Sequence, residues 1–285
     1  MAKPDRTAIL DRYRAMIRQG TPIIGGGAGT GLSGKAQVMG AVDFLVVYNS
    51  GRYRMAGHGS LSGLMPYGDA NAVMLDMIEE VLAVAGETPV VAGVCGTDPM
   101  RSMDRLLEDV ERSGCAGVQN FPTVGLIDGT FRKNLEESGI SYRKEVDMIS
   151  AAHGRGLLTV AYVFTPDEAR LMAIAGASVI VVHFGLTSGG SIGAETTLAL
   201  EDTIAIMDAC AEAALAINPD VLLLCHGGPV AMSADVEYVI QTAKTCHGFL
   251  GASSMERLPT EIAIARTARE FKNIKLSQTH SEAPS

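Results

Sequence analysis

Two stretches near the C-terminus, VLLLCHGGP (221–229) and GFLGASSMER (248–257), decide the fold. Each has the pattern of a short apolar strand that breaks into a loop of small residues. A helix-compatible segment follows each loop, at 233–244 and at 259–271. Consecutive strand-loop-helix units with glycine and hydroxyl residues at the strand exits are typical of the last two units of a (β/α)₈ barrel that binds a phosphate or carboxylate.

The rest of the chain supplies six more units of the same kind. Apolar strands begin near residues 22, 44, 90, 116, 157 and 178, and a helical segment follows each of them. Residues 5–18 form an amphipathic pattern that places one further helix ahead of the barrel, where it could cap the bottom. We therefore predict an α/β fold, a TIM (β/α)₈ barrel with an N-terminal extra helix, as a single domain over residues 1–276. The polar tail, residues 277–285, is expected to be disordered.

The composition narrows the classes of partner. Hydrophobic residues make up 47% of the 285 residues and the formal net charge is −9, which favours a large core and argues against nucleic acid or an anionic membrane surface. The N-terminus lacks the apolar core of a signal peptide, and no run approaches about 18 apolar residues. The five cysteines are scattered and form neither a disulfide framework nor a zinc-site spacing. We expect a cytoplasmic protein without a membrane partner, whose apolar outer helix faces favour a homo-oligomer.

The glycine-rich segment at 25–31 has a spacing similar to the dinucleotide-binding fingerprint. That reading requires an acidic residue at the end of the second strand, where this chain has Tyr48-Asn-Ser-Gly instead, so a Rossmann fold is discounted. Two interpretations of Gly27 remain open. The position either forms a tight turn or lets the backbone approach a ligand.

Strand exits carry the residues that can do chemistry. His183 and His226 end two adjacent predicted strands, where barrel enzymes hold catalytic groups. A long predicted loop at 49–67 contains Arg52 and Arg54, which are either cations for an anionic substrate or solvated surface charges. Asp98, directly before a proline, is expected first as a helix N-cap. Glu256 lies where a helix begins, so it serves either catalysis or the helix dipole.

Four segments resemble the phosphoenolpyruvate hydrolase-like family: residues 34–51, HFGLTSGG (183–190), HGGP (226–229) and GFLGASSMERLP (248–259). The resemblance implies a TIM barrel and chemistry related to phosphoenolpyruvate or phosphonopyruvate, as in the wider phosphoenolpyruvate mutase and isocitrate lyase group. That group holds Mg²⁺ with aspartates at the third and fourth strand ends. Here these ends have the sequences AGVCGTD (92–98) and VQNF (118–121), so Mg²⁺ is left with Asp98 or Glu256 as candidate ligands.

The resulting hypothesis is a hydrolase that cleaves a C–P or phosphate ester bond in a three-carbon 2-oxo acid. His183, His226 or Glu256 would orient water or protonate the enolate leaving group. The residues expected to bind the small anionic substrate lie at strand exits and in the following loops, and are Gly27, Arg52, Asn120, Gly227, Gly228, Gly251, Ala252, Ser253 and Arg257.

Two alternatives remain. The first is a carbon-carbon lyase or aldolase acting on a 2-oxo acid with the help of a metal, because none of the predicted strands contains a lysine for a Schiff base. The second is a non-catalytic barrel that senses a small anion or nucleotide, which would explain the missing pair of aspartates. Turnover separates the enzymes from the sensor, since a sensor would show only thermal stabilisation by its ligand.

Overall fold

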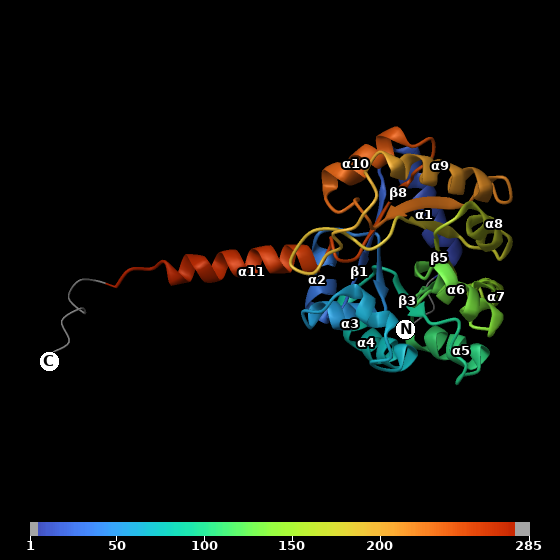
Figure 1. The fold of residues 1–285 in the computed structure, drawn as a ribbon, viewed down its shortest axis with the longest axis horizontal. Helices are drawn as coiled ribbons and strands as arrows, with labels where there is room; N and C mark the ends of the chain where they lie inside the picture. The colour runs from blue at the N-terminus through green and yellow to red at the C-terminus, as the bar shows by residue number, and fades with distance from the viewer. Residues whose placement is uncertain (1–4, 277–285) are drawn as a thin grey trace.

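A computed structural model describes residues 5–276 and shows a closed barrel of eight parallel strands in sequence order (Figure 1). The strands are β1 (Ile23–Gly27), β2 (Phe44–Val47), β3 (Val90–Val94), β4 (Gly117–Asn120), β5 (Leu158–Val163), β6 (Val179–His183), β7 (Leu222–His226) and β8 (Gly248–Gly251). The predicted TIM barrel is confirmed, and each strand begins within one residue of its predicted start. The predicted tail, residues 277–285, lies outside the described residues.

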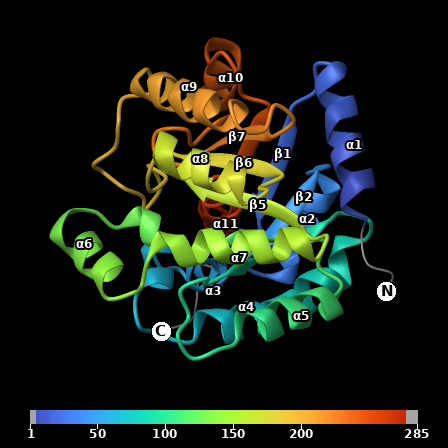
Figure 2. The ribbon, with the colours of Figure 1, turned by 90° about the vertical axis from the view of Figure 1, so that its right-hand side faces the viewer.

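Helices cover the outside of the barrel (Figure 2). They are α1 (Arg6–Arg18), α2 (Gly31–Met39), α3 (Asn49–Met55), α4 (Ala70–Ala85), α5 (Met103–Ser113), α6 (Gly129–Glu137), α7 (Tyr142–Gly154), α8 (Pro166–Ile174), α9 (Asp202–Leu215), α10 (Ser233–Thr242) and α11 (Arg257–Lys272), with the 3-10 helices η1 (Ser60–Leu64) and η2 (Val124–Leu126). Within residues 5–276, no helix is both long and apolar enough to cross a membrane.

Strand alternation divides the core into two layers. One set of strand residues, which includes Val46, Val160 and Leu224, packs inside the barrel. The other set, which includes Val47 and Leu223, packs against the helices. Two layers buried on both faces of the sheet explain why the strands are continuous apolar runs.

The extra helix α1 closes the bottom of the barrel, as its pattern predicts. Asp5 caps it by accepting a hydrogen bond from the amide of Thr7 at 2.9 Å. Tyr13 is fully buried, with its ring centroid 6.2 Å from that of Phe44. Its hydroxyl donates to the carbonyl of Asp43 at 3.1 Å.

Two local predictions are corrected. Residues 49–67 are not a long irregular loop, because α3 begins at Asn49 directly after β2 and η1 follows at Ser60. Asp98 does not cap a helix, because α5 begins only at Met103. The carboxylate of Asp98 instead accepts the amide of Met100 at 2.8 Å and the side-chain amide of Asn71 at 2.9 Å.

The last helix departs from the barrel pattern. Figure 1 shows α11 projecting away from the barrel instead of lying against it. Every residue from 262 to 276 is exposed, including Ile264 at 66% and Phe271 at 71%. The sequence predicts the helix but not its direction.

Candidate active site

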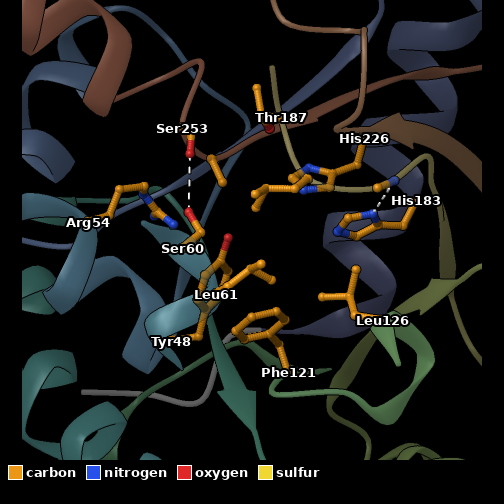
Figure 3. A pocket seen from close by; sticks show the side chains of 13 residues that line it. Tyr48, Arg54, Ser60, Leu61, Phe121, Leu126, His183, Thr187, His226 and Ser253 are labelled. Carbon is orange, nitrogen blue, oxygen red and sulfur yellow. Dashed lines mark hydrogen bonds between the residues drawn. The ribbon is translucent and has the colours of Figure 1, made fainter. Parts of the chain in front are cut away.

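A small hollow lies at the C-terminal ends of the strands, which is the functional face of a TIM barrel (Figure 3). It encloses about 380 Å³ of empty space. Residues from the ends of five strands and the loops that follow them line this mouth: Tyr48, Arg54, Ser60, Leu61, Phe121, Leu126, His183, Gly185, Leu186, Thr187, His226, Ala252 and Ser253.

The two predicted histidines meet at this mouth. His183 and His226 are register partners at the ends of β6 and β7, and their ring centroids lie 4.5 Å apart. Tyr162 of β5 lies beneath both, with its ring centroid 4.9 Å from each. Both imidazoles are buried, at 7% and 5% exposed, yet both line the hollow, so a small ligand can reach them.

Backbone hydrogen bonds fix opposite tautomers for the two neutral rings. The Nδ1 atom of His183 lies 3.0 Å from the amide of Gly185, which can only donate, so the ring proton of a neutral His183 is on Nε2. The Nδ1 atom of His226 lies 2.5 Å from the carbonyl of Leu250, which can only accept, so Nδ1 carries the proton there. The Nε2 atom of His226 is then an acceptor, 3.3 Å from the hydroxyl of Tyr162. The site therefore presents one imidazole donor and one imidazole acceptor.

Burial keeps both rings neutral at physiological pH. It lowers the pKa of His226 to about 4, with the charge of Arg54 acting in the same direction and the Leu250 carbonyl opposing it. Burial, followed by repulsion from His226, lowers the pKa of His183 well below its ordinary value. Burial also raises the pKa of Tyr162 well above that of a free tyrosine. The hydroxyl of Tyr162 consequently keeps its proton.

A buried ion pair holds the guanidinium of Arg54 at the mouth. One carboxylate oxygen of Glu256 accepts from Arg54 Nε at 2.7 Å and from Nη2 at 2.5 Å, and the other accepts the amide of Gly29 at 2.8 Å. The side chains are only 1% and 0% exposed. Burial is the largest single influence and would lower the pKa of Arg54, but the charges and hydrogen bonds of Glu256 and Tyr48 together outweigh it and raise that pKa above its ordinary value.

The third nitrogen of the Arg54 guanidinium indicates what the hollow binds. Nη1 of Arg54 is buried and has no hydrogen-bond partner. A buried donor without an acceptor costs about 1–3 kcal/mol, so such groups call for an explanation. Arg54 lines the hollow, and the guanidinium carbon lies 5.5 Å from the ring centroid of Tyr48. An anion in the hollow would supply the missing acceptor.

Close backbone packing places Arg54 at the mouth. A Cβ on Gly29 would lie 2.2 Å from the carbonyl oxygen of Gly51, so only glycine lets the β1 loop pack onto α3. The side chain of Asn49 donates to the carbonyl of Gly63 at 2.9 Å, which secures η1 above the hollow. Ser60 of η1 lies 3.2 Å from Ser253, hydroxyl to hydroxyl, and closes the opposite side.

Several predicted site residues do gather at the mouth. Ala252 and Ser253 line the hollow together with the two histidines. Gly27 lies against Arg54, because a Cβ there would be 3.1 Å from Nη2. Glu256 reaches the site as the buried partner of Arg54, behind the lining.

Other predicted residues have different neighbours. Arg52 lies at the surface and pairs with Asp76 at 2.8 Å. Arg257 donates to the carbonyl of Gly189 at 3.0 Å. The side-chain amide of Asn120 donates to Glu145 at 2.7 Å. None of Arg52, Arg257 and Asn120 lines the hollow.

The predicted glycines mainly shape the chain. Gly227 and Gly228 have positive φ angles of 75° and 56°, and the amide of Gly228 donates to the carbonyl of Gly185 at 2.8 Å. That amide is therefore not free to bind an anion. Gly251 lies within β8, where a Cβ would be 2.3 Å from the side chain of Met255.

The donor set at the mouth does not fit Mg²⁺. Among residues 5–276, no three His, Cys, Asp or Glu side chains are grouped so that they could hold a metal ion between them. Both carboxylate oxygens of Glu256 are occupied by Arg54 and Gly29. The carboxylate of Asp98, also a candidate ligand, is bound to Asn71, Met100 and Arg101 and does not line the hollow.

Sequence reasoning missed Tyr48 and Phe121, and of the two arginines in residues 49–67 it selected Arg52 as the substrate ligand, whereas Arg54 lines the hollow. The two arginines could not be told apart because residues 49–67 have the composition of a loop. Once residues 49–55 are helical, Ser50 and Arg54 are four positions apart and share the inward face. Tyr48 and Phe121 directly follow β2 and β4, and their ring centroids lie 4.5 Å apart. Aromatic residues at strand ends were the available signal.

Known proteins resemble this chain over nearly its full length. The tomato (Solanum lycopersicum) ToMV resistance protein Tm-1(GCR237) is 54% identical over 279 residues, which are 96% of this chain and 37% of that protein. The ToMV susceptible protein tm-1(GCR26) of the same plant matches equally, with 54% identity over 96% of this chain and 37% of its own. This chain thus spans little more than a third of these relatives.

Solved structures share the fold at low identity. A 2,3-dimethylmalate lyase, described as a PEP mutase/isocitrate lyase superfamily member, superposes with a TM-score of 0.57 at 18% identity, covering 97% of this chain and 92% of that chain. A phosphonopyruvate hydrolase complex with oxalate and Mg²⁺ superposes with a TM-score of 0.57 at 14% identity and the same coverage. The family model described as phosphoenolpyruvate hydrolase-like matches residues 8–274, and this chain therefore belongs to the phosphoenolpyruvate hydrolase-like family.

Proposed function

We propose that this chain is a hydrolase of small anionic 2-oxo acids that cleaves the C–P bond of phosphonopyruvate. One observation carries the proposal. A buried arginine with an unpartnered Nη1 lines a small hollow together with two neutral histidines of opposite tautomer. Membership of the phosphoenolpyruvate hydrolase-like family supports the choice of substrate class.

The hollow is suited to a small acid. Nη1 of Arg54 offers a charge-assisted hydrogen bond to a carboxylate or phosphonate oxygen. The hydroxyls of Ser60, Thr187 and Ser253 line the same hollow and can donate to the remaining oxygens. The hollow is small, which favours a small acid over a nucleotide.

The two imidazoles take different roles in the reaction. As water attacks phosphorus, the P–O bond forms, the P–C bond breaks and its electron pair moves onto the pyruvate enolate. His183 donates from Nε2 to the developing enolate oxygen, a role that a neutral imidazole performs without losing its proton. His226 accepts the water proton at Nε2, in place of its hydrogen bond from Tyr162, and that proton then passes to C3 of the enolate to give pyruvate. Phosphate is the second product.

We propose further that this reaction does not use Mg²⁺. The solved phosphonopyruvate hydrolase contains Mg²⁺, but the mouth of this chain offers a guanidinium instead of free carboxylates. Arg54 would bind the substrate anion through Nη1 in place of a metal ion. A guanidinium stays protonated over the whole physiological pH range, so it remains a hydrogen-bond donor to an anion throughout.

A carbon-carbon lyase is the second candidate, and one feature favours it. Leu61, Phe121 and Leu126 form an apolar wall of the hollow, which would accommodate an alkyl substituent on a 2-hydroxy or 2-oxo acid. The same donor and acceptor pair would serve an enolate leaving group formed by breaking a C–C bond.

The test is turnover by the full chain. Purified protein is incubated with phosphonopyruvate, phosphoenolpyruvate or 2,3-dimethylmalate, with added Mg²⁺ or with EDTA, while pyruvate and phosphate are quantified. We expect equal amounts of pyruvate and phosphate from phosphonopyruvate, under both metal conditions. Cleavage of dimethylmalate alone would support the lyase, and thermal stabilisation by all three acids without any product would support a sensor.

A further inference from the structure

We propose that Glu145 is a positioning residue of the mouth. Through Asn120 it fixes Tyr162 beneath the two histidines, and through the amide of Val124 it holds the apolar wall of the hollow. The proposal rests on the proposed hydrolysis, because it explains how the base of that reaction is placed. Glu145 lies on α7, is fully buried and does not itself line the hollow. A buried carboxyl group is costly unless it is hydrogen-bonded, so its contacts indicate its role.

The side chain of Asn120 continues the sheet beyond the end of β4. The backbone pairing of β4 with β5 ends at Gln119 and Val160. Past that pair, Oδ1 of Asn120 accepts the amide of Tyr162 at 2.7 Å, and Nδ2 donates to the carbonyl of Tyr162 at 3.2 Å. The side-chain amide thus takes the place of a strand backbone and satisfies both polar groups of Tyr162.

The carboxyl group of Glu145 keeps this amide in its orientation. Oε2 of Glu145 accepts a hydrogen bond from Nδ2 of Asn120 at 2.7 Å, so Oδ1 stays directed at the amide of Tyr162. Tyr142 lies three residues earlier on α7 and therefore on the same face of that helix. Its hydroxyl donates to the carbonyl of Tyr162 at 2.6 Å. Two side chains of α7 consequently support the end of β5.

Tyr162 in turn places the two histidines. Its ring centroid lies 4.9 Å from that of His183 and from that of His226, and its hydroxyl lies 3.3 Å from Nε2 of His226. Nε2 is the atom that accepts the water proton in the proposed reaction. A misplacement of about 1 Å at a reacting group can cost about 10²-fold in rate. Glu145 and Asn120 therefore control the base of the reaction without touching the substrate.

The other oxygen of Glu145 holds the apolar wall. Oε1 accepts the amide of Val124 at 2.8 Å, and Val124 is the first residue of η2. Leu126 of η2 lines the hollow together with Phe121, and Figure 3 shows both side chains reaching into it. One carboxyl group thus joins the wall of the hollow to the residue beneath the histidines. Its loss should disturb both.

The first test is the kinetics of Glu145→Gln on phosphonopyruvate. A glutamine side chain has one acceptor and one donor group, so it cannot accept from both Asn120 and Val124. We expect kcat to fall by about 10–100-fold. The control is Thr159→Val, which removes a buried hydroxyl that donates to the carbonyl of Gly176 at 2.9 Å near the other end of β5. It should lower the melting temperature but leave kcat within about twofold, because Thr159 does not line the hollow.

A second variant exchanges the donor and the acceptor. In Asn120→Asp/Glu145→Gln, the new glutamine can donate to the new aspartate while its amide oxygen still accepts from Val124. The double variant should recover kcat to within about tenfold of wild type. Asn120→Asp alone places two carboxyl groups against each other and should stay as slow as Glu145→Gln. A folded double variant no faster than either single variant would overturn the proposal.

Nitrogen NMR of the imidazoles at neutral pH separates this proposal from the proposed function, since it needs no turnover. His226→Gln identifies the signals of His226. In Glu145→Gln, the Nε2 signal of His226 should shift toward that of an imidazole nitrogen without a donor, and it should return in the double variant. An unchanged signal in Glu145→Gln would overturn the positioning role. The expected shift in a chain that does not hydrolyse phosphonopyruvate would support the positioning role and overturn the proposed function alone.

Discussion

The mouth of the barrel and the groove on its flank, beside β1, β8 and α10, are two hollows of the same barrel, and they differ in size and in the groups they offer. The mouth is the smaller, about 380 Å³ with the space open to solvent, and its lining combines a guanidinium, two imidazoles and several hydroxyls with an apolar wall. The groove is about 1270 Å³ and largely apolar, and no segment of residues 5–276 fills it. The mouth is therefore suited to a small anion, whereas the groove is suited to a helix.

The two hollows are connected by one short segment. Ala252 and Ser253 line the mouth, Ser254 and Met255 line the groove, and Glu256 returns to bind Arg54. The segment 252–256 therefore links the direction of α11 to the charge balance of the mouth. Substitutions in the mouth should therefore change catalysis alone, and substitutions in the groove or on α11 should change association alone.

The largest effect is expected from Arg54→Met. Removing the guanidinium deletes the unpartnered donor and should lower kcat/KM for phosphonopyruvate by about 10²–10³-fold, as for a lost oxyanion donor. It also leaves Glu256 buried without its partner, at a cost of about 3–5 kcal/mol in stability.

The double variant Arg54→Met/Glu256→Gln distinguishes these two consequences. It should recover much of the thermal stability, because no uncompensated charge remains, while kcat/KM stays low. Recovery of activity in the double variant would contradict the assignment of Arg54 to substrate binding.

The next effect is the pH dependence of stability caused by His226. Its pKa in the fold is about 4, below the ordinary 6.5, so the unfolded chain binds more protons in between and stability falls as the pH drops through this window. At about pH 5 the loss attributable to His226 should be roughly 2 kcal/mol relative to neutral pH. Urea unfolding of wild type and His226→Gln measures it as a difference.

Taking the difference between wild type and His226→Gln also cancels the contributions of other titrating groups, some of which oppose that of His226. Burial raises the pKa of Glu145 from 4.5 to about 8, so its contribution to stability rises as the pH falls between these two values and shifts the pH profile of both proteins alike. If His226→Gln lost stability on acidification as steeply as wild type, His226 would not be a buried neutral base.

A smaller effect is expected at the mouth when α11 is changed. Ile264→Arg/Phe271→Arg should retain the rate of phosphonopyruvate hydrolysis within about threefold, because only the root of α11 contacts the mouth. Substitutions of exposed residues also have little effect on stability. Initial rates of wild type and variant, compared at equal chain concentration, test this. A loss comparable to that of Arg54→Met would show that association of copies completes the site.

The smallest effects are expected from Arg52→Met and from EDTA. Arg52 pairs with Asp76 at the surface, with side chains 41% and 77% exposed, so its loss should change kcat/KM less than about twofold. It is the matched control for Arg54→Met, two residues away on the same helix.

EDTA should likewise leave the rate within about twofold, and rescue by Mg²⁺ would contradict a guanidinium-based site.

The spacing of apolar residues, together with the glycines and prolines that end each element, predicts most of this fold. Continuous apolar runs locate all eight strands, and the same runs place His183 and His226 at adjacent strand ends, where the closed barrel brings them together. Their proximity follows from topology alone. Their tautomers do not, because these depend on the amide of Gly185 and the carbonyl of Leu250, which tertiary folding supplies.

The arginines show where sequence reasoning reaches its limit. Arg52 and Arg54 are indistinguishable while residues 49–67 are treated as a loop, and only the helical turn from Asn49 directs one outward and the other inward. Arg257 likewise binds a neighbouring loop instead of the hollow. A local helical turn decides the first case, and a long-range contact decides the second.

The central claim is that Arg54 holds a small dianion at the mouth, and calorimetric titration with oxalate tests it most directly. Oxalate is chosen because it is planar and resembles the enolate of pyruvate. The account predicts that the wild-type chain binds one oxalate per mouth in the presence of EDTA, and that Arg54→Met/Glu256→Gln, folded by circular dichroism, binds none. Equal binding by both proteins, or binding by wild type only when Mg²⁺ is added, would contradict it.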